Sequence, residues 1–275
     1  QNSIAGLSVG WLSVRRNDMN GHKSKDMNRM TSLEKGLYLL SLFGEEPYKL
    51  TIAELVRISG LNRTTVYRTL ATLEEWGMLI RDGKSKAYRM GPTTFHMGNI
   101  YLMNANYKES IHAILEKIGE ESAESVGMAH REGNQVVSIF SIETHQPVKV
   151  NDKPGTFYPM NKGCYGKCLM AYYDPVIVKE LLDGFTFEKT APNTLTEKED
   201  ILREYEKIRQ QGFVESIEET VPYVIGVGVP LRSPDGQVEN VVAISFFKQD
   251  DYREKLERLK NILLRYQREL EMYLH

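Results

Sequence analysis

Cys164 and Cys168 are the two cysteines of this 275-residue chain, and they lie four positions apart. That spacing would place both thiols on one face of a helix, but a metal site would need two further ligands, and no histidine lies nearby in the sequence. A catalytic thiol needs a base and an electropositive setting. Lys162 and Lys167 could lower a thiol pKa, yet the sequence supports no Cys-His-acid arrangement. We therefore interpret both cysteines as buried small residues.

Phosphate binding by a glycine-rich loop is a second chemistry that the sequence does not support. Gly226-Val227-Gly228 lies within an apparent strand, where glycines indicate close approach of backbones and not a nucleotide cradle. We expect no enzyme activity, no metal site and no cofactor.

Residues 63–76 have the side-chain types that recognise DNA. At about 100° per residue, Val66, Leu70 and Leu73 form one buried stripe of a helix. A different, exposed face carries guanidinium groups, hydroxyls and an aromatic ring, and no carboxylate. The residues of this face are Arg63, Thr64, Tyr67 and Arg68. Arg reads guanine edges in the major groove and hydroxyls hold phosphates, so we expect this face in the groove and Thr65 near the phosphates. The alternative is that this face is an ordinary solvent-exposed helix surface without a DNA partner.

The elements that must position this face are two helices separated by a tight break. Gly60 can take the left-handed conformation that ends a helix, and Asn62 can cap the next one. Two short apolar runs around a turn at residues 82–83 then predict a hairpin, whose basic tip includes Lys84 and Lys86. Helix, helix and basic hairpin is the order of a winged helix-turn-helix, in which the wing touches the DNA backbone or minor groove.

Charge is unevenly distributed along the chain. Residues 1–90 carry 14 Lys and Arg against 9 Asp and Glu, a balance of +5, whereas residues 91–275 carry 21 against 28, a balance of −7. A basic first third joined to an acidic remainder fits a DNA-contacting head on a body that keeps away from phosphate. The length and the hydrophobic content of 41% are sufficient for two domains with their own cores.

The sequence also indicates the cellular compartment of the protein. Residues 1–29 lack an initiator Met and a long apolar region before a small-residue cleavage site, so we interpret them as a disordered extension and not as a signal peptide. No run of 18 apolar residues occurs, so we expect no membrane span. Two cysteines exclude a disulfide framework, and the expected localisation is a reducing cytoplasm.

Two further regions follow the hairpin. Residues 92–107 are apolar on most sides, so we expect a linker helix that connects two domains and pairs with its copy in a dimer. From residue 108, amphipathic helices alternate with strand-like runs. This order predicts an α+β domain in which helices cover one face of an antiparallel sheet and a ligand cavity lies on the other. The last helix is expected to pack on the sheet and not to form a coiled coil.

Several motifs resemble the IclR family of bacterial transcription regulators. SLEKGLYLLSLF, LTIAELVRISGLNRTTVYRTLATLEEWGML and YRMG are similar to that family's DNA-binding domain. GTFYPMNKGCYGKCLMAY, IRQQGFVESIEE and VIGVGVPLRSPDGQVENVVAIS are similar to its effector domain, in the same order. The resemblance implies a winged helix-turn-helix at residues 30–91, a linker helix at 92–107 and a GAF-like effector-binding domain at 108–275. It also implies a homodimer or homotetramer and a palindromic operator in double-stranded DNA.

Carried over by position, the resemblance implies an effector pocket. Its residues would be Tyr158, Cys164, Tyr165, Val224, Gly226, Ser245 and Phe247. Backbone NH groups at the start of a helix over residues 163–173 would then face a carboxylate, as helix N-termini do. The sequence departs from the family pattern at Cys164 and Tyr165, where the family has small residues, and at Asn161-Lys162, where it has His-Ala. These changes predict a pocket that is smaller, more aromatic or turned to a different ligand.

Two functions follow from these patterns. The first is a ligand-responsive DNA-binding transcriptional regulator, with repressor favoured over activator, that senses a small organic acid or an aromatic metabolite. The second is a small-molecule-binding or enzymatic α+β protein whose basic N-terminal helices serve protein contacts. DNA binding by the first third of the chain distinguishes them, because only the regulator predicts an affinity that falls steeply with salt.

Overall fold

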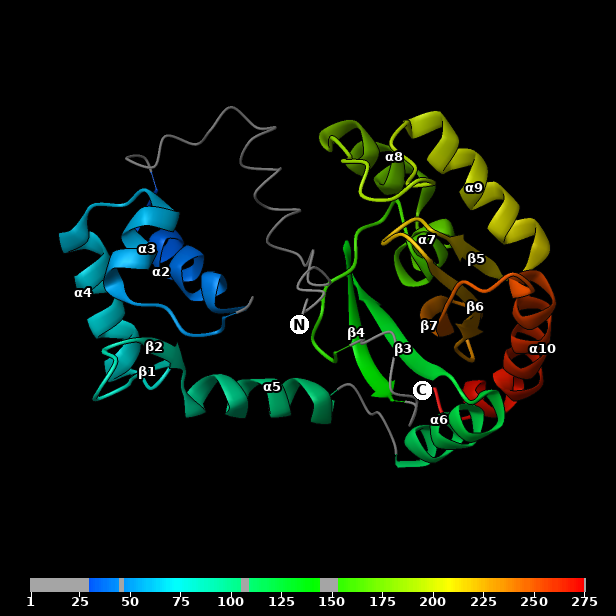
Figure 1. Cartoon of the computed structure of the whole chain (residues 1–275), viewed down its shortest axis with the longest axis horizontal. Helices are drawn as coiled ribbons and strands as arrows, with labels where there is room; N and C mark the ends of the chain where they lie inside the picture. Colours follow the sequence, from blue (N-terminus) through cyan, green and yellow to red (C-terminus); the bar gives the residue numbers. More distant parts are fainter. Residues whose placement is uncertain (1–29, 45–46, 105–108, 144–152, 275) are drawn as a thin grey trace. The chain divides into compact units, whose positions relative to one another are not determined.

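A computed structural model describes residues 30–44, 47–104, 109–143 and 153–274, so the expected extension at residues 1–29 and the end of the linker at 105–107 lie outside it. The described residues form two compact units, residues 30–104 and residues 109–274 (Figure 1). The first unit contains α2 (Ser32–Ser41), the 3-10 turn η2 (Leu42–Gly44), α3 (Ile52–Ser59), α4 (Arg63–Glu75), β1 (Leu79–Arg81), β2 (Tyr88–Met90) and α5 (Pro92–Asn104).

Side-chain caps set the limits of the helices in the first unit. A capping box begins each of α2 and α3. Gly60 has a left-handed φ of 69° and ends α3, and the Asn62 side chain accepts a hydrogen bond from the Thr65 NH at 2.8 Å to begin α4. The predicted break between the two helices is thus confirmed at both residues. Of the predicted stripe on α4, Val66 and Leu70 are fully buried and Leu73 is partly buried against the same core.

The hairpin after α4 differs from the prediction in its turn. Strands β1 and β2 pair in antiparallel register, with Leu79 opposite Met90. Their connection spans residues 82–87 and is not a two-residue turn at 82–83. The Asp82 carboxylate accepts hydrogen bonds from the NH groups of Lys84 at 3.0 Å and Ser85 at 2.7 Å. Asp therefore favours a longer loop here, because its side chain closes the turn that the backbone would otherwise close.

The second unit is an α+β domain. Its elements are α6 (Glu109–Ser122), β3 (Ser125–Glu132), β4 (Gln135–Ile142), α7 (Cys164–Ala171), α8 (Pro175–Gly184), α9 (Lys198–Gln211), β5 (Val214–Ile217), β6 (Val224–Arg232), β7 (Val238–Phe247) and α10 (Tyr252–Glu271). The five strands form one sheet in the order β4-β3-β7-β6-β5, and every neighbouring pair is antiparallel.

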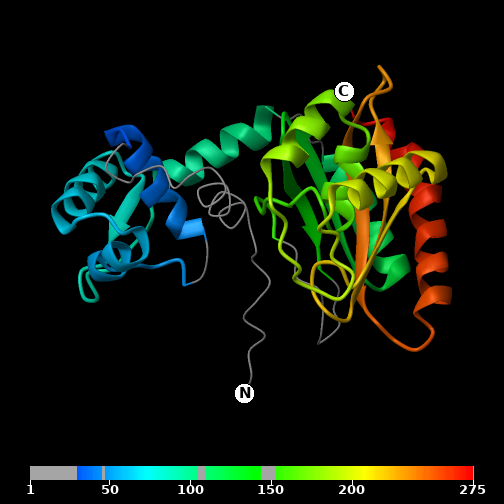
Figure 2. The same cartoon turned by 90° about the horizontal axis from the view of Figure 1, so that it is seen from above.

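Helices cover both faces of this sheet, which corrects the prediction of helices on one face only (Figure 2). Helices α6 and α10 pack on one face, and α7 packs on the other with α8 and α9 against it. The reason lies in β6, which is buried along nearly its whole length. A strand that is apolar at consecutive positions must be covered on both sides. Any ligand site on the α7 face must therefore lie between the sheet and that helix.

The last helix packs on the sheet as expected. Leu256, Leu259, Leu263 and Leu270 are buried in one core with β6 and β7, and so is Ile262. This apolar face is wider than the narrow seam of a coiled coil. None of the described helices combines the length and the apolar character that crossing a bilayer requires.

Candidate functional site

Helix α4 presents its polar face to solvent. Arg63, Thr64, Tyr67 and Arg68 are all exposed, and the Tyr67 ring keeps 55% of its accessible surface. Thr65 is half-buried, and its NH group is already bonded to the Asn62 cap. The face is therefore free to meet a partner, and the buried stripe opposite it fixes its direction.

The wing residues are also exposed. Lys84 and Lys86 lie in the loop that Asp82 closes. Lys86 has a left-handed φ of 56°, and its Nζ donates a hydrogen bond to the Gly83 carbonyl at 2.7 Å. The loop is thus held by its own polar groups.

In the second unit, a row of small side chains crosses the sheet beneath α7. Ser125 of β3, Ser245 of β7, Gly226 of β6 and Ser216 of β5 are successive cross-strand partners. The next row on the same face contains Ser141, Gly127, Ala243, Gly228 and Val214, and all but Val214 are small. Small residues in both rows allow the helix to approach the sheet closely.

Helix α7 begins directly over Gly226. A Cβ atom added to Gly226 would lie 2.8 Å from Cys164 Sγ and 3.3 Å from Ser245 Oγ. The residue thus has no space for a side chain, and the thiol fills the position that one would take. This close approach brings three of the residues assigned to the effector pocket together.

The remaining residues assigned to the pocket fall into two groups. Tyr158 and Tyr165 form a perpendicular aromatic pair with ring centroids 4.8 Å apart. Val224 and Phe247 are cross-strand partners, one row beyond Gly226 and Ser245 on the same face. Tyr158 itself lies elsewhere on this face, because its NH donates a hydrogen bond to the Val136 carbonyl of β4 at 2.9 Å and Val136 pairs with Arg131, several rows from Ser125.

Two hydroxyl groups on this face are unusual. The Oγ atoms of Ser125 and Ser141 are buried and have no hydrogen-bond partner in the part of the chain that the structure describes. Buried polar groups are almost always hydrogen-bonded. These two oxygens are therefore available to a ligand that can donate or accept a hydrogen bond.

The thiols are poor reactive groups. Burial raises the pKa of both Cys164 and Cys168, and for Cys164 the nearby Lys167 ammonium offsets this only in part. A nucleophilic or metal-binding cysteine needs a lowered thiol pKa. Across the described ranges, no group of three His, Cys, Asp or Glu side chains is placed to hold a metal ion.

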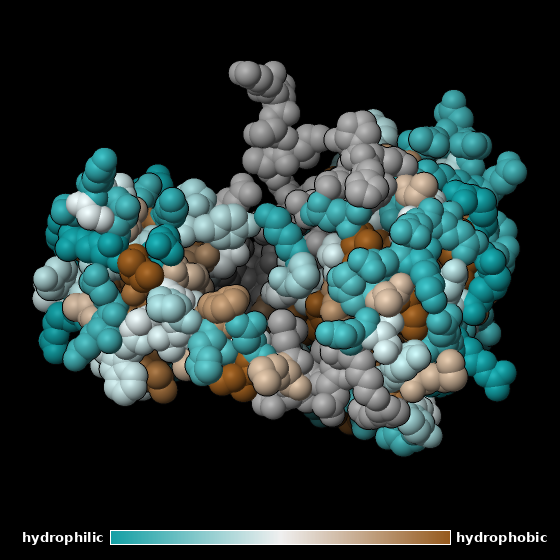
Figure 3. Space-filling view, turned by 90° about the horizontal axis from the view of Figure 1, so that it is seen from below, coloured by the Kyte–Doolittle hydropathy of each residue, from teal (hydrophilic) through white to brown (hydrophobic). Residues whose placement is uncertain are grey.

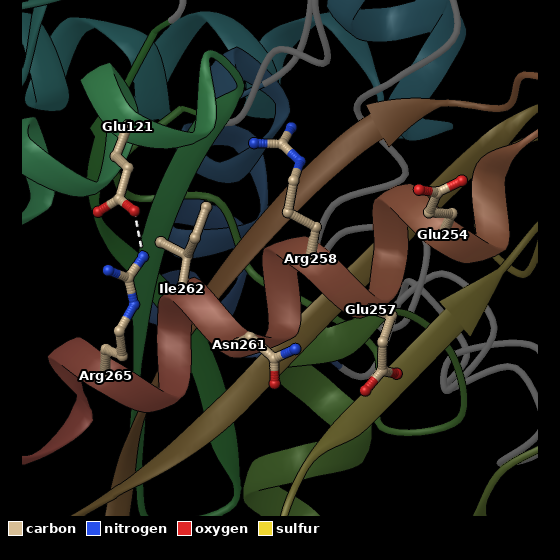
Figure 4. Close-up of a pocket in the computed structure, with 7 residues that line it drawn as sticks. All are labelled: Glu121, Glu254, Glu257, Arg258, Asn261, Ile262 and Arg265. Carbon is tan, nitrogen blue, oxygen red and sulfur yellow. Dashed lines mark hydrogen bonds and ion pairs between the residues drawn. The ribbon is translucent and has the colours of Figure 1, made fainter.

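A shallow groove of about 610 Å³ lies on the opposite face of the sheet, between α6 and α10 (Figure 4). Its lining residues are Glu121, Glu254, Glu257, Arg258, Asn261, Ile262 and Arg265. Arg265 forms an ion pair with Glu121 across the groove. Small-molecule sites are concave and bury most of the ligand, so this open groove, which is lined mainly by charged side chains, is not the candidate site.

Two family models match the chain over most of its length. The IclR helix-turn-helix domain matches residues 32–83, and the bacterial transcriptional regulator IclR C-terminal domain matches residues 99–271. The chain belongs to the IclR family. It is therefore a transcriptional regulator with a helix-turn-helix DNA-binding domain and a C-terminal effector-binding domain, which confirms the predicted α+β fold and the predicted class of protein.

Its relatives in the IclR family include regulators from several bacteria. The HTH-type transcriptional regulator KipR of Bacillus subtilis is 26% identical over 247 residues, which cover 88% of this chain and 98% of KipR. The DNA-binding transcriptional repressor YiaJ of Escherichia coli is 26% identical over 237 residues, covering 85% and 84%. An IclR homologue of Microbacterium hydrocarbonoxydans, solved with 4-hydroxybenzoate, has a TM-score of 0.73 at 20% identity over 89% of this chain and 99% of that chain.

The relatives also separate the two functions that the sequence left open. They are named transcriptional regulators and not enzymes, which confirms the prediction that this IclR-family chain has no enzyme activity.

A buried ion network at the start of α7 was not predicted from the sequence. The fully buried Lys167 places its Nζ 2.6 Å from Glu219 Oε1, 2.8 Å from Glu204 Oε1 and 2.7 Å from the Glu215 carbonyl. The second oxygen of Glu219 accepts a hydrogen bond from the Gly163 NH at 3.0 Å. A lysine between apolar residues of a short helix was the available signal, because charged residues are almost never fully buried unless paired.

The pKa values in this network follow from burial and pairing. Burial opposes the charged form of Lys167, but Glu219 and Glu204 outweigh it and raise the pKa of the ammonium. Burial raises the pKa of Glu219 above its ordinary value of 4.5, and Lys167 offsets this only in part. At the start of α7, the Gly163 NH is thus bonded to a carboxylate of the chain itself.

Proposed function

We propose that this regulator is an effector-responsive repressor that binds a palindromic operator as a homodimer or homotetramer. In this proposal residues 30–91 bind DNA, residues 92–107 link the domains, and residues 108–275 bind the effector. Because its target is DNA in a bacterial cell, we place the protein in the cytoplasm. The repressor YiaJ among its relatives supports repression as the sense of the response.

The open polar face of α4 is the observation that carries the proposal. Arg63, Thr64, Tyr67 and Arg68 are exposed on one side of a helix whose opposite side is buried. The first turn holds no acidic residue, and Glu74 and Glu75 come only in the last turn. We infer that this face enters the major groove, with Thr65 and the NH groups of the first turn near a phosphate.

The wing would add contacts outside the major groove. Lys84 and Lys86 are exposed on the loop of the β1–β2 hairpin, and Arg89 is exposed on β2. Cations at this position neutralise phosphates and fix the register of the recognition helix without reading bases.

Helix α5 supports a second copy as a partner. Its large apolar side chains are exposed, with 74% of the surface accessible for Phe95 and 78% for Met103. Apolar side chains of the first unit are visible on the surface in Figure 3. A helix that is apolar without a buried face needs a partner, and a two-fold dimer places two recognition helices on two half-sites of a palindrome. Replacing Phe95 by Lys should shift the chain towards monomer in sedimentation velocity; an unchanged profile contradicts this role of α5.

Binding of an effector near Gly226 would regulate DNA binding. A ligand shifts the equilibrium between two arrangements of the paired heads only by its different affinity for them. The Tyr158–Tyr165 ring pair supports an aromatic effector, and the Microbacterium homologue was solved with 4-hydroxybenzoate. We propose Tyr158, Cys164, Tyr165, Val224, Gly226, Ser245 and Phe247 as the effector-binding residues.

The proposal is tested by fluorescence anisotropy of the full chain on duplex DNA from upstream of its own gene. We expect affinity that falls steeply with salt, and a loss of specific binding in the Arg63→Ala/Arg68→Ala variant. The matched control is Arg203→Ala, which removes an exposed guanidinium of α9 in the second unit. Equal affinity of both variants and the unmodified chain for DNA would refute the assigned face.

A further inference from the structure

Helix α10 presents a long polar face to solvent. The helix lies on the outside of the second unit (Figure 2) and its leucines pack towards the sheet. At about 100° per residue, the side chains opposite these leucines form one exposed stripe. Its members are Glu254, Glu257, Asn261, Leu264, Arg265 and Arg268. Because α10 has 20 residues, this face is about 30 Å long.

Three side chains of this face have no partner within the protein. The side chains of Glu254, Asn261 and Arg268 form no hydrogen bond or ion pair with any other residue in the described part of the chain. Two neighbouring positions differ in this respect, since Glu257 pairs with Lys260 at 2.6 Å and Arg265 pairs with Glu121 of α6. The three unpaired side chains are therefore free to meet another molecule.

The charges on this face are arranged symmetrically about Asn261. Glu254 lies seven positions before Asn261 and Arg268 seven positions after it, and Glu257 and Arg265 lie four positions before and after it. A two-fold axis through Asn261 would place each position before it against the position equally far after it in an antiparallel copy. Every acidic residue of the stripe would then meet a basic residue.

We propose that α10 is a self-association surface, which pairs antiparallel with α10 of a second copy of this chain about a two-fold axis at Asn261. Glu254 then faces Arg268 of the partner subunit, and Glu257 faces Arg265 of the partner subunit. Complementary charges of this kind select the partner and fix the register. The inference rests on the proposed function, because the α10 contact joins two DNA-binding dimers, each held by α5, into a tetramer.

The centre of the stripe suits a close approach of two copies. The Asn261 amide carries both donors and an acceptor, so two copies of it exchange hydrogen bonds across the axis, and a polar residue at such a position specifies the register of paired helices. Leu264 is 41% exposed and lies three positions after Asn261. It therefore faces Arg258 of the partner subunit, whose aliphatic stem can cover it.

The groove between α6 and α10 adds a concave surface beside this face. Six of its seven lining residues belong to α10, and Figure 4 shows Glu257 and Asn261 on the same side of the helix. The ion pair of Arg265 with Glu121 does not prevent a second contact. Arg265 is 62% exposed, surface pairs contribute little to stability, and a guanidinium has five donors.

Charge reversal tests the pairing by sedimentation velocity of the full chain. We expect a tetramer at about 10 µM, and a dissociation constant at least about tenfold higher in Glu254→Arg and in Arg268→Glu, because like charges then face each other. Neither residue has a partner within its own chain, so the melting temperatures should stay unchanged. The matched control is Glu199→Arg, which reverses an exposed glutamate in the first turn of α9.

Restoration of the tetramer identifies the contact. An equimolar mixture of Glu254→Arg and Arg268→Glu should form tetramers again, and so should the double variant Glu254→Arg/Arg268→Glu, because opposite charges face each other in both. The proposal is overturned if either single variant sediments like the unmodified chain, or if neither the mixture nor the double variant restores the association. A monomeric unmodified chain at this concentration overturns it as well.

The two contacts are separated by the variant Phe95→Lys. It removes the proposed α5 contact, so the chain should remain a dimer through α10, and Phe95→Lys/Glu254→Arg should be monomeric. In anisotropy, Glu254→Arg should bind a duplex with one operator within about twofold of the unmodified chain, because the α5 dimer is intact. If the unmodified chain does not bind operator DNA, the DNA-binding proposal fails whatever charge reversal does. If it binds and charge reversal has no effect, only the role of α10 is wrong.

Discussion

Replacing Gly226 by Ala tests the close approach of α7 to the sheet. The new methyl group would lie 2.8 Å from Cys164 Sγ, 3.3 Å from Ser245 Oγ and 3.5 Å from the Ile244 carbonyl oxygen. The first distance is shorter than any ordinary contact between carbon and sulfur, so the helix or the thiol must move. The backbone of Gly226 does not have a positive φ, so Ala adds no backbone strain.

The expected cost follows from two opposing effects. Overpacking a close-packed core typically costs about 1–3 kcal/mol, and exchange of Gly for Ala at a compatible position gains about 0.4–1 kcal/mol through the unfolded chain. We expect Gly226→Ala to lower the free energy of unfolding by about 1–2 kcal/mol, which lowers the melting temperature by about 2–8 °C for a domain of this size.

A double-mutant cycle identifies the cause. Cys164→Ala alone should cost about 1 kcal/mol of buried apolar contact, but in the Gly226→Ala background it removes the clash and should restore part of the stability. The coupling energy should be about 1 kcal/mol or more. Gly228→Ala is the matched control, because its added methyl would meet Ala243, Val214 and the Val242 backbone and not Cys164. Additive effects of Cys164→Ala and Gly226→Ala in thermal unfolding followed by circular dichroism would refute the contact.

Three further predictions concern the network, the turn beside it and the DNA face. Burial raises the pKa of Glu219 above 4.5. The unmodified chain should therefore be most stable relative to Glu219→Gln at or below pH 4.5, and this difference should fall as the pH rises through the raised pKa. The difference is measured by thermal unfolding across this pH range, and a difference that grows with pH would contradict the prediction. Tyr223 is exposed and has a left-handed φ of 63°. Tyr223→Gly should therefore raise the free energy of unfolding, measured with urea, by about 0.5–1 kcal/mol. The control Tyr223→Ala keeps the backbone strain and should not raise it. Arg68→Ala should cost about 1–3 kcal/mol in operator binding if the guanidinium reads a base, and an equal loss on unrelated DNA in the same anisotropy assay would show that it contacts only phosphate.

The local elements could be predicted from the sequence because their signals are short-range. Gly60 and Asn62 determine the break between α3 and α4 by backbone conformation and capping, which depend on a few neighbouring residues. The buried stripe of α4 follows from helical periodicity in the same way. The wing turn was misjudged because the Asp82 side chain competes with the backbone for the same NH groups.

The network at α7 could not be predicted because its partners are distant in sequence. Lys167 meets Glu204 and Glu219, which lie 37 and 52 positions away, and only the fold brings them together. The two-sided covering of the sheet escaped prediction for a similar reason, since an apolar run such as β6 shows that a strand is buried but not by which helices. The row of Ser125, Ser245 and Gly226 depends on strand register, which single strands do not reveal.

Glu219 is held in place by a turn that is strained on both sides of it. Glu218 and Tyr223 both have left-handed φ values, 51° and 63°. The turn persists because the Glu218 carboxylate binds Lys248 Nζ at 2.5 Å and the Tyr223 NH at 3.0 Å. Such strain is kept where the surrounding structure determines a position tightly, and it clusters at functional sites.

This arrangement fixes the position of a charge and is not explained by added stability. A buried ion pair often stabilises no more than apolar residues of the same volume would, so Lys167 and Glu219 contribute little that a leucine pair could not. What apolar residues could not do is place a fixed negative charge against the Gly163 NH. The strained turn and the buried lysine together hold the Glu219 carboxylate at the Gly163 NH, where α7 begins.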